Sequence, residues 1–413
     1  MNKFFSLISS MFKRRSFSDI LKKNIELIYG YPLYLLSFLM PRNKNKWLIG
    51  SHIGFAGNSK YFFIDVVTEH KNKKCFWIAS TRQEAAEIKA LGLPAYYRWS
   101  IKGVFHSLTA GVYIFSFHLI DINFWTSGRA LRVNLWHGVG IKNIEFKVTQ
   151  GSAGKIYDEK NIISRIYFPY IFKRPHIFLS TSPLMTQHFK GCFRITDKEC
   201  MEGTYPRCDI FQWDKSRLTE FINKYEPKDT KILIDKLKTF NKSYLYMPTW
   251  RETRYDFITS AGFNFKELDK VLKEKNEVFL LKLHPSTKLD IENMNGLENI
   301  LILNNKMDIY PVLPFTDVLI TDYSSIYYDY LLMENKQVLL FPFDYNEYIT
   351  KARDLAFDFD TYTPGKRANN FEELLYYIKN DTPLDFPKKE WITQQFWNGN
   401  KDNLLRKIET LTK

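Results

Sequence analysis

The sequence predicts an α/β protein of two doubly wound, Rossmann-like domains, preceded by an amphipathic segment. The first observation is length, because 413 residues exceed one ordinary domain and fit two. The second is an alternation of short, almost wholly apolar runs with amphipathic stretches, which is typical of parallel sheets covered on both faces. The third is that this alternation stops in the charged stretch 214–231 and then begins again.

Residues 1–45 are predicted to form an amphipathic, membrane-associating segment. The stretch 1–17 (MNKFFSLISSMFKRRSF) places apolar side chains on one side of a helix and basic residues at its ends. The stretch 25–40 is also apolar, but it contains Glu26 and Pro32, and its uncharged part is shorter than the roughly 20 residues that span a bilayer. The pattern fits a helix in the membrane interface and a helix packed on the protein's own core equally well.

Ten apolar runs are the expected strands. In a first domain, predicted over 46–212, they are 46–50, 75–79, 111–117, 131–136 and 176–180. In a second domain, predicted over 235–400, they are 243–248, 278–284, 300–304, 317–321 and 337–342, and residues 401–413 form a closing helix. Ligands of open α/β sheets bind beyond the carboxyl ends of the strands. Two such domains side by side therefore predict a cleft lined by residues that follow strands.

Composition restricts the partners. The formal charge of +14, from 59 basic and 45 acidic residues, favours phosphorylated substrates, anionic lipid or nucleic acid. Nucleic acid is disfavoured, because the aromatic side chains lie inside apolar runs and not in an exposed basic stripe. The four cysteines form no C-x-x-C pair, which argues against zinc and disulfides and is typical of the cytoplasm. There is no P-loop, and no G-x-G-x-x-G motif opens the first domain.

Two predicted strand ends carry a histidine. In NLWHGVGIK, His137 directly follows a strand, where it can take a proton from a hydroxyl near neutral pH. Gly138 and Gly140 beside it permit close backbone approach. In KLHPS, Lys282 and His284 alternate along the strand, so both face one way and form a plausible anion site. The structural alternatives are a buried histidine held by backbone for His137, a lysine that reaches solvent for Lys282 and a capping histidine for His284.

Two further strand ends carry groups suited to phosphate. MPTWRET supplies Thr249 and Arg251, whose planar guanidinium matches phosphate oxygens. TDYSSIYYDY places Ser324 and Ser325 where a strand gives way to a helix, so that free N–H groups and hydroxyls can bind phosphate. Asp329 lies four residues beyond Ser325 on the same helix face, within reach of a ribose or glycerol hydroxyl. The serines can equally form an N-cap, and the two roles are compatible.

Five motifs in this order resemble the CDP-glycerol glycerophosphotransferase family of teichoic-acid primases, polymerases and capsule enzymes: WHGVGIK, YPRCD, PTWRE, KLHP and ITDYSSIYYD. The stretches SHIGFAGNSKYFF (51–63) and DFDTYTPG (358–365) are also similar, and the resemblance spans about 46–402. It implies a GT-B-like fold with acceptor binding in the first domain and CDP-donor binding in the second. It also implies attack of an acceptor hydroxyl on the β-phosphorus of CDP-glycerol, with release of CMP.

The resemblance further implies residue roles. His137 would be the base, and His284 would stabilise charge on the pyrophosphate or help CMP to leave. Donor contacts are expected at Gly138, Val139, Gly140, Ile141, Arg207, Thr249, Arg251, Lys282, Ser324, Ser325 and Asp329. Because such cations and N–H groups can neutralise phosphate charge themselves, we expect no cofactor and no metal.

The sequence does not determine the chemical identity of the donor or of the acceptor. CDP-ribitol, or another nucleotide-activated sugar or polyol on the same fold, is the alternative donor, and the expected acceptor is lipid-linked or polymeric. Only about 45 residues precede the first predicted strand, which favours a primase-like or capsule-type member. The basic charge and the amphipathic segment predict a peripheral protein on an anionic membrane surface, at the cytoplasmic face of the cell membrane.

Overall fold

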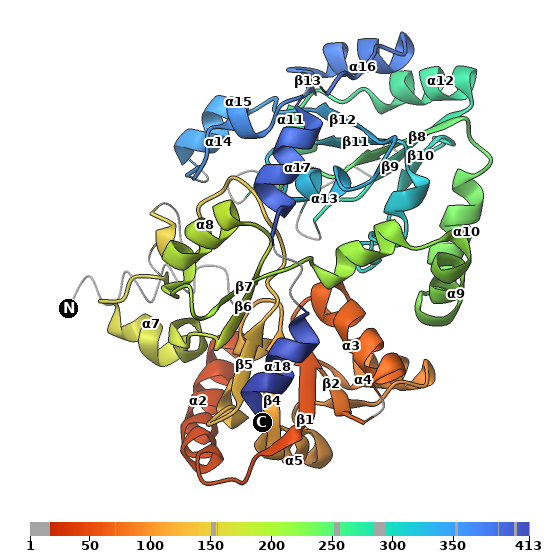
Figure 1. The fold of residues 1–413 in the computed structure, drawn as a ribbon. Coiled ribbons are helices and arrows are strands. Elements are labelled where there is room, and N and C mark those ends of the chain that lie inside the picture. The colour runs from red at the N-terminus through yellow and green to blue at the C-terminus, as the bar shows by residue number, and fades with distance from the viewer. Residues whose placement is uncertain are drawn as a thin grey trace. The chain divides into compact units, whose positions relative to one another are not determined.

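The computed structural model describes residues 17–70, 72–149, 154, 156–251, 257–284, 287, 295–351, 354–386, 388–399 and 403–412. The basic, amphipathic residues 1–16 lie outside this part. The chain divides into two compact units, each built on one parallel sheet (Figure 1). Unit 1 holds the chain up to His137, Ile144–Arg207 and Gly399–Lys413, and unit 2 holds Gly138–Asn143 and Cys208–Asn398.

Unit 1 contains a seven-stranded sheet in the order β3-β2-β1-β4-β5-β6-β7, with every described pair parallel. The strands are β1 (Asn43–Gly50), β2 (Lys74–Ala79), β3 (Ala95–Tyr97), β4 (Ala110–Phe115), β5 (Leu131–Asn134), β6 (Ile177–Ser180) and β7 (Cys200–Glu202). Every residue of β4 is buried, as expected for a central strand covered on both faces. The strand order reverses between β1 and β4, and ligands of such sheets bind at this switch point.

The helices of unit 1 lie before, between and after these strands in the sequence. They are α2 (Phe17–Ser37), α3 (Gly57–Glu69), α4 (Arg82–Ala90), α5 (Ile101–Thr109), α7 (Ile162–Tyr167), α8 (Pro183–Phe193) and α18 (Leu404–Thr412), with 3₁₀ turns η1 (Leu119–Asp121), η2 (Phe124–Thr126), η3 (Glu145–Lys147) and η4 (Pro169–Phe172). Polar N-caps start several of them; Thr81, for example, accepts a hydrogen bond from the Glu84 N–H at 3.0 Å.

Unit 2 contains a six-stranded parallel sheet in the order β10-β9-β8-β11-β12-β13. The strands are β8 (Lys242–Tyr246), β9 (Glu277–Leu281), β10 (Ile300–Ile302), β11 (Val318–Thr321), β12 (Gln337–Leu340) and β13 (Lys366–Arg367). The order reverses between β8 and β11, so residues just after these two strands occupy the second switch point.

The helices described in and around unit 2 are α9 (Lys215–Tyr225), α10 (Lys228–Leu237), α11 (Phe257–Ser260), α12 (Phe265–Lys275), α13 (Ile326–Tyr330), α14 (Tyr345–Lys351), α15 (Phe359–Tyr362), α16 (Phe371–Lys379) and α17 (Lys389–Trp397), with 3₁₀ turns η5 (Pro206–Gln212) and η7 (Leu313–Phe315). The core of unit 2 packs apolar residues of the sheet against α12 and α16.

The predicted fold class is confirmed, and all ten predicted strands exist. Three strands were not predicted, namely β3, β7 and β13, because runs of two or three residues carry no readable apolar pattern. The charged stretch 214–231 forms α9 and the first turn of α10, which belong to unit 2, and α18 at the end of the chain belongs to unit 1.

Helix α2 confirms packing on the protein's own core for the segment 25–40, and its place in a membrane interface stays a prediction. Leu27, Leu33 and Tyr34 pack against the core of unit 1. The Trp125 indole N–H donates to Glu26 at 2.7 Å, and Gly30 lies so close to the Trp125 ring that a Cβ there would clash. Apolar side chains on the opposite side of α2, such as Ile28 and Leu35, are exposed. Across the described residues, we find no helix with the length and apolar character needed to cross a membrane.

Candidate active site

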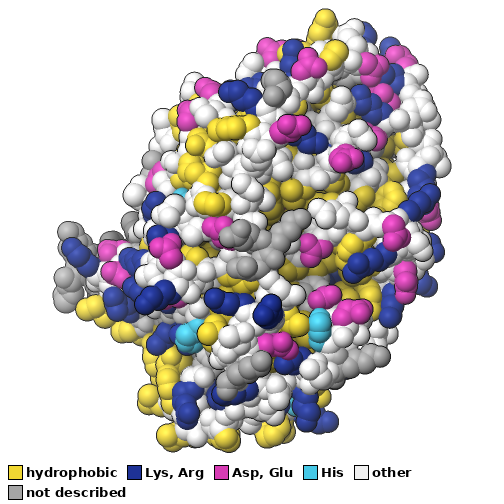
Figure 2. All heavy atoms as spheres, viewed as in Figure 1, with side chains coloured by type: hydrophobic (Ala, Val, Ile, Leu, Met, Phe, Trp, Pro, Cys, Tyr) yellow, Lys and Arg dark blue, Asp and Glu magenta, His cyan; other side chains and the backbone are white. Residues whose placement is uncertain are grey.

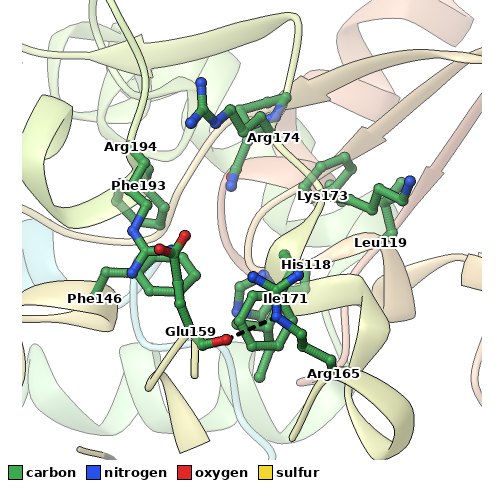
Figure 3. Close-up of a pocket in the computed structure, with 14 residues that line it drawn as sticks. His118, Leu119, Phe146, Glu159, Arg165, Ile171, Lys173, Arg174, Phe193 and Arg194 are labelled. Carbon is green, nitrogen blue, oxygen red and sulfur yellow. Dashed lines mark hydrogen bonds and ion pairs between the residues drawn. The ribbon is translucent and has the colours of Figure 1, made fainter. Parts of the chain in front are cut away.

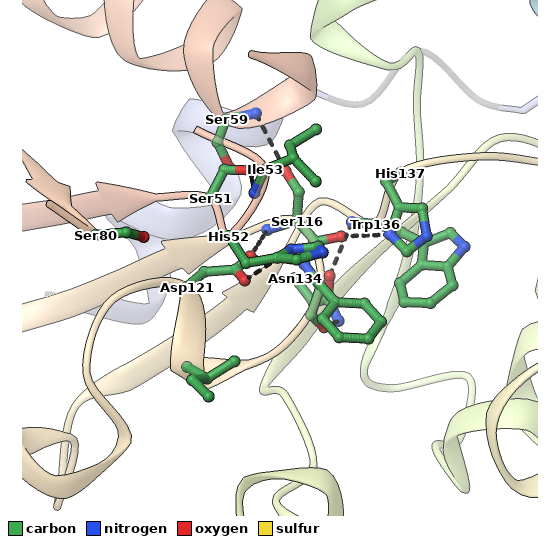
Figure 4. Close-up of polar contacts among 12 residues, drawn as sticks. Ser51, His52, Ile53, Ser59, Ser80, Ser116, Asp121, Asn134, Trp136 and His137 are labelled. Carbon is green, nitrogen blue, oxygen red and sulfur yellow. Dashed lines mark hydrogen bonds and ion pairs between the residues drawn. The ribbon is translucent and has the colours of Figure 1, made fainter. Parts of the chain in front are cut away.

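His137 stands three residues beyond the end of β5 in unit 1 (Figure 4). Its Nδ1 lies 2.9 Å from the carbonyl oxygen of Ser116, which follows β4. Because a carbonyl only accepts, Nδ1 must carry the hydrogen, and Nε2 then holds the lone pair of the neutral ring. The preceding Trp136 has a left-handed backbone, with φ of 52°, a conformation that directs the chain out of the strand. The local geometry therefore prepares Nε2 to accept a proton.

The carbonyl that orients His137 is itself held by a buried network. The Asp121 carboxylate accepts from the backbone N–H groups of Ser116 at 3.0 Å and Phe117 at 2.9 Å. The Ser116 hydroxyl meets the Ser59 hydroxyl at 2.6 Å. His52, after β1, places Nδ1 3.3 Å from the other Asp121 oxygen. Figure 4 shows that these side chains converge at the carboxyl ends of β1 and β4, the switch point of the sheet.

The electrostatics keep His137 neutral. Burial of the site lowers the pKa of His137 from 6.5 to about 4, and the nearby Arg207 guanidinium adds to this effect, while the Ser116 hydrogen bond opposes it. The His137 side chain nevertheless keeps an exposed surface, from which a substrate hydroxyl can approach. A histidine with a lowered pKa is unprotonated at pH 7 and available as a base.

Arg207 is buried and bound to the same loop. Its Nη1 donates to the His137 carbonyl at 2.7 Å, and its backbone N–H donates to the Asn58 side chain at 3.3 Å. The Asn58 amide in turn donates to the carbonyls of Leu135 at 3.2 Å and Trp136 at 2.9 Å. In this structure Arg207 thus supports the loop that carries His137. Its contact with a donor stays a prediction.

In unit 2, the glycine-containing segment 138–143 packs beside the serine pair. A Cβ placed on Gly140 would lie 3.8 Å from Ser325 Cβ and 3.5 Å from the Tyr328 ring. Gly140 has φ of 148°, which side chains rarely adopt, so glycine is favoured here. The Ile141 carbonyl accepts from the Ala356 N–H at 2.6 Å and anchors the segment. Gly140 and Ser325, both predicted to contact the donor, are 185 positions apart in sequence and yet lie together in unit 2.

The serine pair does not cap its helix. Ser325 precedes α13 with helical backbone angles, and its side chain makes no capping hydrogen bond. Instead, the backbone carbonyls of Ser324 and Ser325 accept from the N–H groups of Tyr327 at 3.2 Å and Tyr328 at 3.1 Å. The N-cap interpretation of this pair is therefore wrong, because α13 starts within a continuous helical turn. The phosphate-binding interpretation stays a prediction.

Thr249 and Arg251 follow β8 and are bound to two buried carboxylates. Asp322, after β11, accepts from the Thr249 N–H at 2.8 Å and from Arg251 Nη2 at 2.8 Å. Asp344 accepts two further bonds from the guanidinium, at 2.7 Å each. Burial lowers the pKa of Arg251, but the two carboxylates outweigh this and raise it above its usual range.

This arrangement has a consequence for phosphate binding. One guanidinium neutralised by two carboxylates offers no surplus positive charge to an anion, so Arg251 serves here to fix Thr249. The Thr249 hydroxyl is buried and has no hydrogen-bond partner in the part of unit 2 that the structure describes. An unsatisfied hydroxyl at a switch point is suited to a ligand oxygen. Direct contact of Arg251 with the donor stays a prediction.

Lys282 and His284 follow β9, which ends at Leu281 and not at the predicted residue 284. The Lys282 ammonium donates to the carbonyls of Asn304 at 2.7 Å and Asn305 at 2.9 Å, and burial lowers its pKa to about 8. The exposed His284 ring stacks on Trp250 with centroids 4.9 Å apart, and burial lowers its pKa as well. His284 is therefore neutral at pH 7 and offers an N–H rather than a charge.

Asp329 lies in α13 and is fully buried. Its carboxylate accepts a short hydrogen bond from the Tyr310 hydroxyl. The sequence places it on the face of Ser325, but this structure turns it into the core of unit 2. A contact with a ligand hydroxyl stays a prediction.

The described residues contain no group of three His, Cys, Asp or Glu side chains able to hold a metal ion.

Residues 33–398 match the family described as CDP-Glycerol:Poly(glycerophosphate) glycerophosphotransferase. The chain belongs to this family. The predicted resemblance is thereby confirmed, and so is the GT-B-like fold of two Rossmann-like units.

Some relatives of this chain are described as ribitol-phosphate enzymes and others as glycerol-phosphate enzymes. The chain is 23% identical to a teichoic acid ribitol-phosphate primase of Bacillus spizizenii, over 91% of this chain and 92% of that protein. It is 23% identical to a teichoic acid poly(glycerol phosphate) polymerase of Bacillus subtilis, over 86% of this chain and 46% of that protein. A structure of the wall teichoic acid polymerase TagF, a variant soaked with CDPG, matches with a TM-score of 0.70 at 19% identity, over 96% of each chain.

The family likeness does not by itself indicate the supporting residues. Asn58 lies in the family-like stretch 51–63, which is a sequence signal for this residue, although not for its contact with residues 135–136. Asp121 and Asp344 have no motif around them. Only the structure identifies them as supporting residues, because the fold brings their carboxylates to Ser116 and Arg251.

Proposed function

We propose that this member of the family transfers glycerol phosphate from CDP-glycerol to a hydroxyl of a lipid-linked or growing teichoic-acid-like or capsular polymer, releasing CMP. The observation that carries the proposal is the neutral His137 ring, whose Nδ1 is held by the Ser116 carbonyl so that Nε2 can accept a proton. CDP-ribitol is the second candidate donor, supported by the match to a ribitol-phosphate primase over nearly the whole chain.

The reaction proposed is a single displacement at phosphorus. The acceptor oxygen forms a bond to the β-phosphorus while the bond from that phosphorus to the bridging oxygen of CMP breaks. The hydroxyl proton passes to His137 Nε2, and CMP leaves with the bond's electron pair. Such transfers depend chiefly on positioning and on neutralising charge around the transferred phosphoryl group.

The donor groups of unit 2 suit this task. Ser324 and Ser325 supply hydroxyls beside the backbone of Gly138–Ile141, and Thr249 supplies a further hydroxyl. Lys282, with a pKa near 8, is mostly protonated at pH 7 and offsets negative charge. His284 is neutral, and it would donate a hydrogen bond to the departing phosphate. We propose that these groups act without a metal ion.

Turnover of purified protein tests this function. The protein is incubated with CDP-glycerol and an oligomeric glycerol phosphate acceptor, with and without EDTA, and CMP release is measured. We expect release in both conditions, and a fall of about 10²-fold or more in His137→Ala. Full rates in both His137→Ala and His284→Ala would disprove the mechanism. Transfer from CDP-ribitol alone would reassign the donor, and transfer from a UDP-sugar alone would overturn the proposal.

The proposed location is an anionic membrane surface at the cytoplasmic face of the cell. Figure 2 shows hydrophobic side chains gathered at the lower left, where Figure 1 places α2. The apolar but exposed side chains along one side of α2 are Leu21, Ile25, Ile28, Pro32, Leu35 and, just past the helix, Leu39. They recur every three or four residues and so form one continuous stripe. A stripe of this kind is typical of a contact with lipid or protein, and the charge of +14 favours anionic lipid.

A further inference from the structure

A cavity of about 220 Å³ lies within unit 1, at the carboxyl ends of β4 and β5 (Figure 3). Phe115 is the last residue of β4 and Asn134 the last residue of β5, and both line it. The other walls come from the turn after β4, from η3, from α7 and η4, and from the end of α8. None of the residues predicted to act on the substrates lines this cavity.

The lining is strongly basic. Four cations, Arg165, Lys173, Arg174 and Arg194, face one carboxylate, Glu159. Glu159 forms an ion pair with Arg194, and its carbonyl accepts from Arg165 Nε at 2.8 Å, as Figure 3 shows. Across the described residues, no carboxylate forms an ion pair with the other three cations. The cavity therefore carries excess positive charge and attracts anions.

The Arg194 side chain is held in place before any ligand arrives. Its guanidinium lies 3.6 Å from the centre of the Phe146 ring, and its backbone is left-handed with φ of 54° at the end of α8. This left-handed residue ends α8, and its backbone N–H donates to the Lys190 carbonyl, so the base of the side chain is fixed by the helix end. A planar guanidinium fixed by stacking loses little freedom when it binds phosphate oxygens.

The cavity is adjacent to the proposed base. His118 lines it, and the His118 ring lies 4.3 Å from the Phe117 ring, measured between centroids. The same Phe117 ring lies 5.5 Å from the His137 ring. The Phe117 ring thus lies close both to His118, which lines the cavity, and to His137, all within unit 1. Behind His118, the buried Glu145 lies 3.2 Å away, with a left-handed backbone of φ 50° and a hydrogen bond from Tyr157 at 2.9 Å.

We propose that this cavity binds a phosphate ester group of the acceptor and so presents the acceptor hydroxyl to His137. The inference rests on the proposed function, which it deepens by assigning an acceptor subsite. At about 220 Å³ the cavity is smaller than the roughly 300–1,000 Å³ typical of sites for whole drug-sized ligands. It fits a phosphate group with its ester oxygens and not a complete CDP-linked donor.

The surroundings suit an amphiphilic acceptor. Helix α7 contributes Arg165 to the cavity, while Ile162 and Ile166 of the same helix are exposed. The Ile166 carbonyl accepts from the Tyr31 hydroxyl of α2 at 2.9 Å, so the two helices are neighbours. Lys173 lies over the Tyr34 ring of α2 at 5.5 Å. A phosphate in the cavity therefore lies next to the exposed apolar residues of α2 and α7, where a lipid chain can pack.

The test uses the double variant Arg165→Gln with Arg174→Gln. Both side chains are exposed, so the fold should tolerate the change. The matched control is Arg82→Gln with Lys89→Gln, two exposed cations of α4, which packs at the β2–β3 edge of the same sheet. We expect KM for a glycerol phosphate oligomer to rise at least about tenfold in the test variant, with KM for the CDP-linked donor unchanged. The control variant should resemble wild type.

Two acceptors distinguish the source of the phosphate. If the double variant has a raised KM for a water-soluble oligomer, the cavity binds the polyol-phosphate chain. If its KM rises only for a lipid-linked diphosphate in detergent, the cavity binds the phosphate of the lipid carrier. An unchanged KM for both acceptors overturns the proposal. Lys173→Gln is measured in parallel as a single change, and thermal unfolding confirms that each variant is folded.

Failure of the function and failure of the subsite give different results. If wild-type protein transfers nothing from CDP-glycerol or CDP-ribitol, the proposed function fails. The cavity is then judged by titrating glycerol 3-phosphate into wild type and the double variant by calorimetry. Equal affinity in the two proteins overturns the anion site, and binding to wild type that the variant loses supports it.

Discussion

At the scale of single residues, the site depends on groups whose pKa values are shifted by burial. His137 has its pKa lowered, so it is neutral at pH 7, and Lys282 has its pKa lowered to about 8, so it is still mainly charged. The base and the cation therefore hold their required forms over the same pH range.

The pH dependence of kcat/KM for the donor and acceptor tests these shifts. The base form of His137 exists above its pKa, so activity should persist below pH 6.5 and fall only at lower pH. The cationic form of Lys282 exists below its pKa, so activity should decline above pH 8. Lys282→Arg should move the alkaline decline upward, because arginine stays charged. An acid limb centred at 6.5 would contradict the lowered pKa of His137.

The serine pair gives a second residue-scale prediction. Ser324→Ala combined with Ser325→Ala should change the free energy of unfolding by less than about 1 kcal/mol, because neither side chain caps α13. The same variant should bind the CDP-linked donor weakly. Thr81→Ala is the control, since Thr81 caps α4 and its loss should cost about 1 kcal/mol. Chemical denaturation and calorimetry measure both quantities, and a large unfolding effect with unchanged donor binding would reverse the interpretation.

At the scale of elements, α2 is a helix with two apolar sides. One side is buried because Leu27, Leu33 and Tyr34 pack on the core of unit 1. The other is exposed: Ile28 is 76% and Leu35 is 69% accessible. Isolated exposed apolar residues are ordinary on protein surfaces, but a regular stripe needs a partner to shield it from water.

Vesicle binding tests the stripe. Ile28→Glu combined with Leu35→Glu should abolish most co-sedimentation with anionic phospholipid vesicles, because charged groups cannot enter the apolar interface without a large cost. Ile232→Glu in α10 is the control, since Ile232 is 65% exposed but lies outside the stripe. Turnover on a water-soluble acceptor should survive the double change. Unaltered vesicle binding would assign the stripe to another partner.

At the scale of the whole molecule, the end of the chain returns to the unit where it began. Helix α18 follows unit 2 in sequence, but its Ile408 is fully buried in unit 1. The Glu409 carboxylate pairs with Lys73 at 2.9 Å, and that ammonium lies 5.2 Å from the Trp47 ring centre. Unit 1 is therefore completed only after unit 2 has been synthesised.

Hydrogen exchange can detect this dependence. Ile408→Ala should destabilise unit 1 by about 2–5 kcal/mol, the cost of a buried large-to-small change. Amides of β1 should exchange faster, whereas those of β11 in unit 2 should not. Leu411→Ala, at a half-exposed position of the same helix, should have little effect. Equal acceleration in the two sheets would show that they unfold as one cooperative unit.

The sequence was enough to predict ten of the thirteen described strands, although not the residue at which each one ends. Apolar runs of four or more residues, such as β4, mark a parallel sheet, and His137 and Thr249 follow such runs directly. It also determined the family, because five short motifs occur in one order. Strands as short as β13 could not be predicted, since two residues show no periodicity.

Only the folded chain shows which side chains from distant parts of the sequence are in contact. It placed Gly140 beside Ser325, bound Arg251 between Asp322 and Asp344, and collected four cations around a cavity that no motif indicates. Sequence patterns report periodicity along one element, whereas hydrogen bonds, ion pairs and cavities join residues that are distant in the chain. The desolvation that lowers the pKa of His137 likewise arises only in the folded unit, where distant residues such as Ser116 and Arg207 pack beside it.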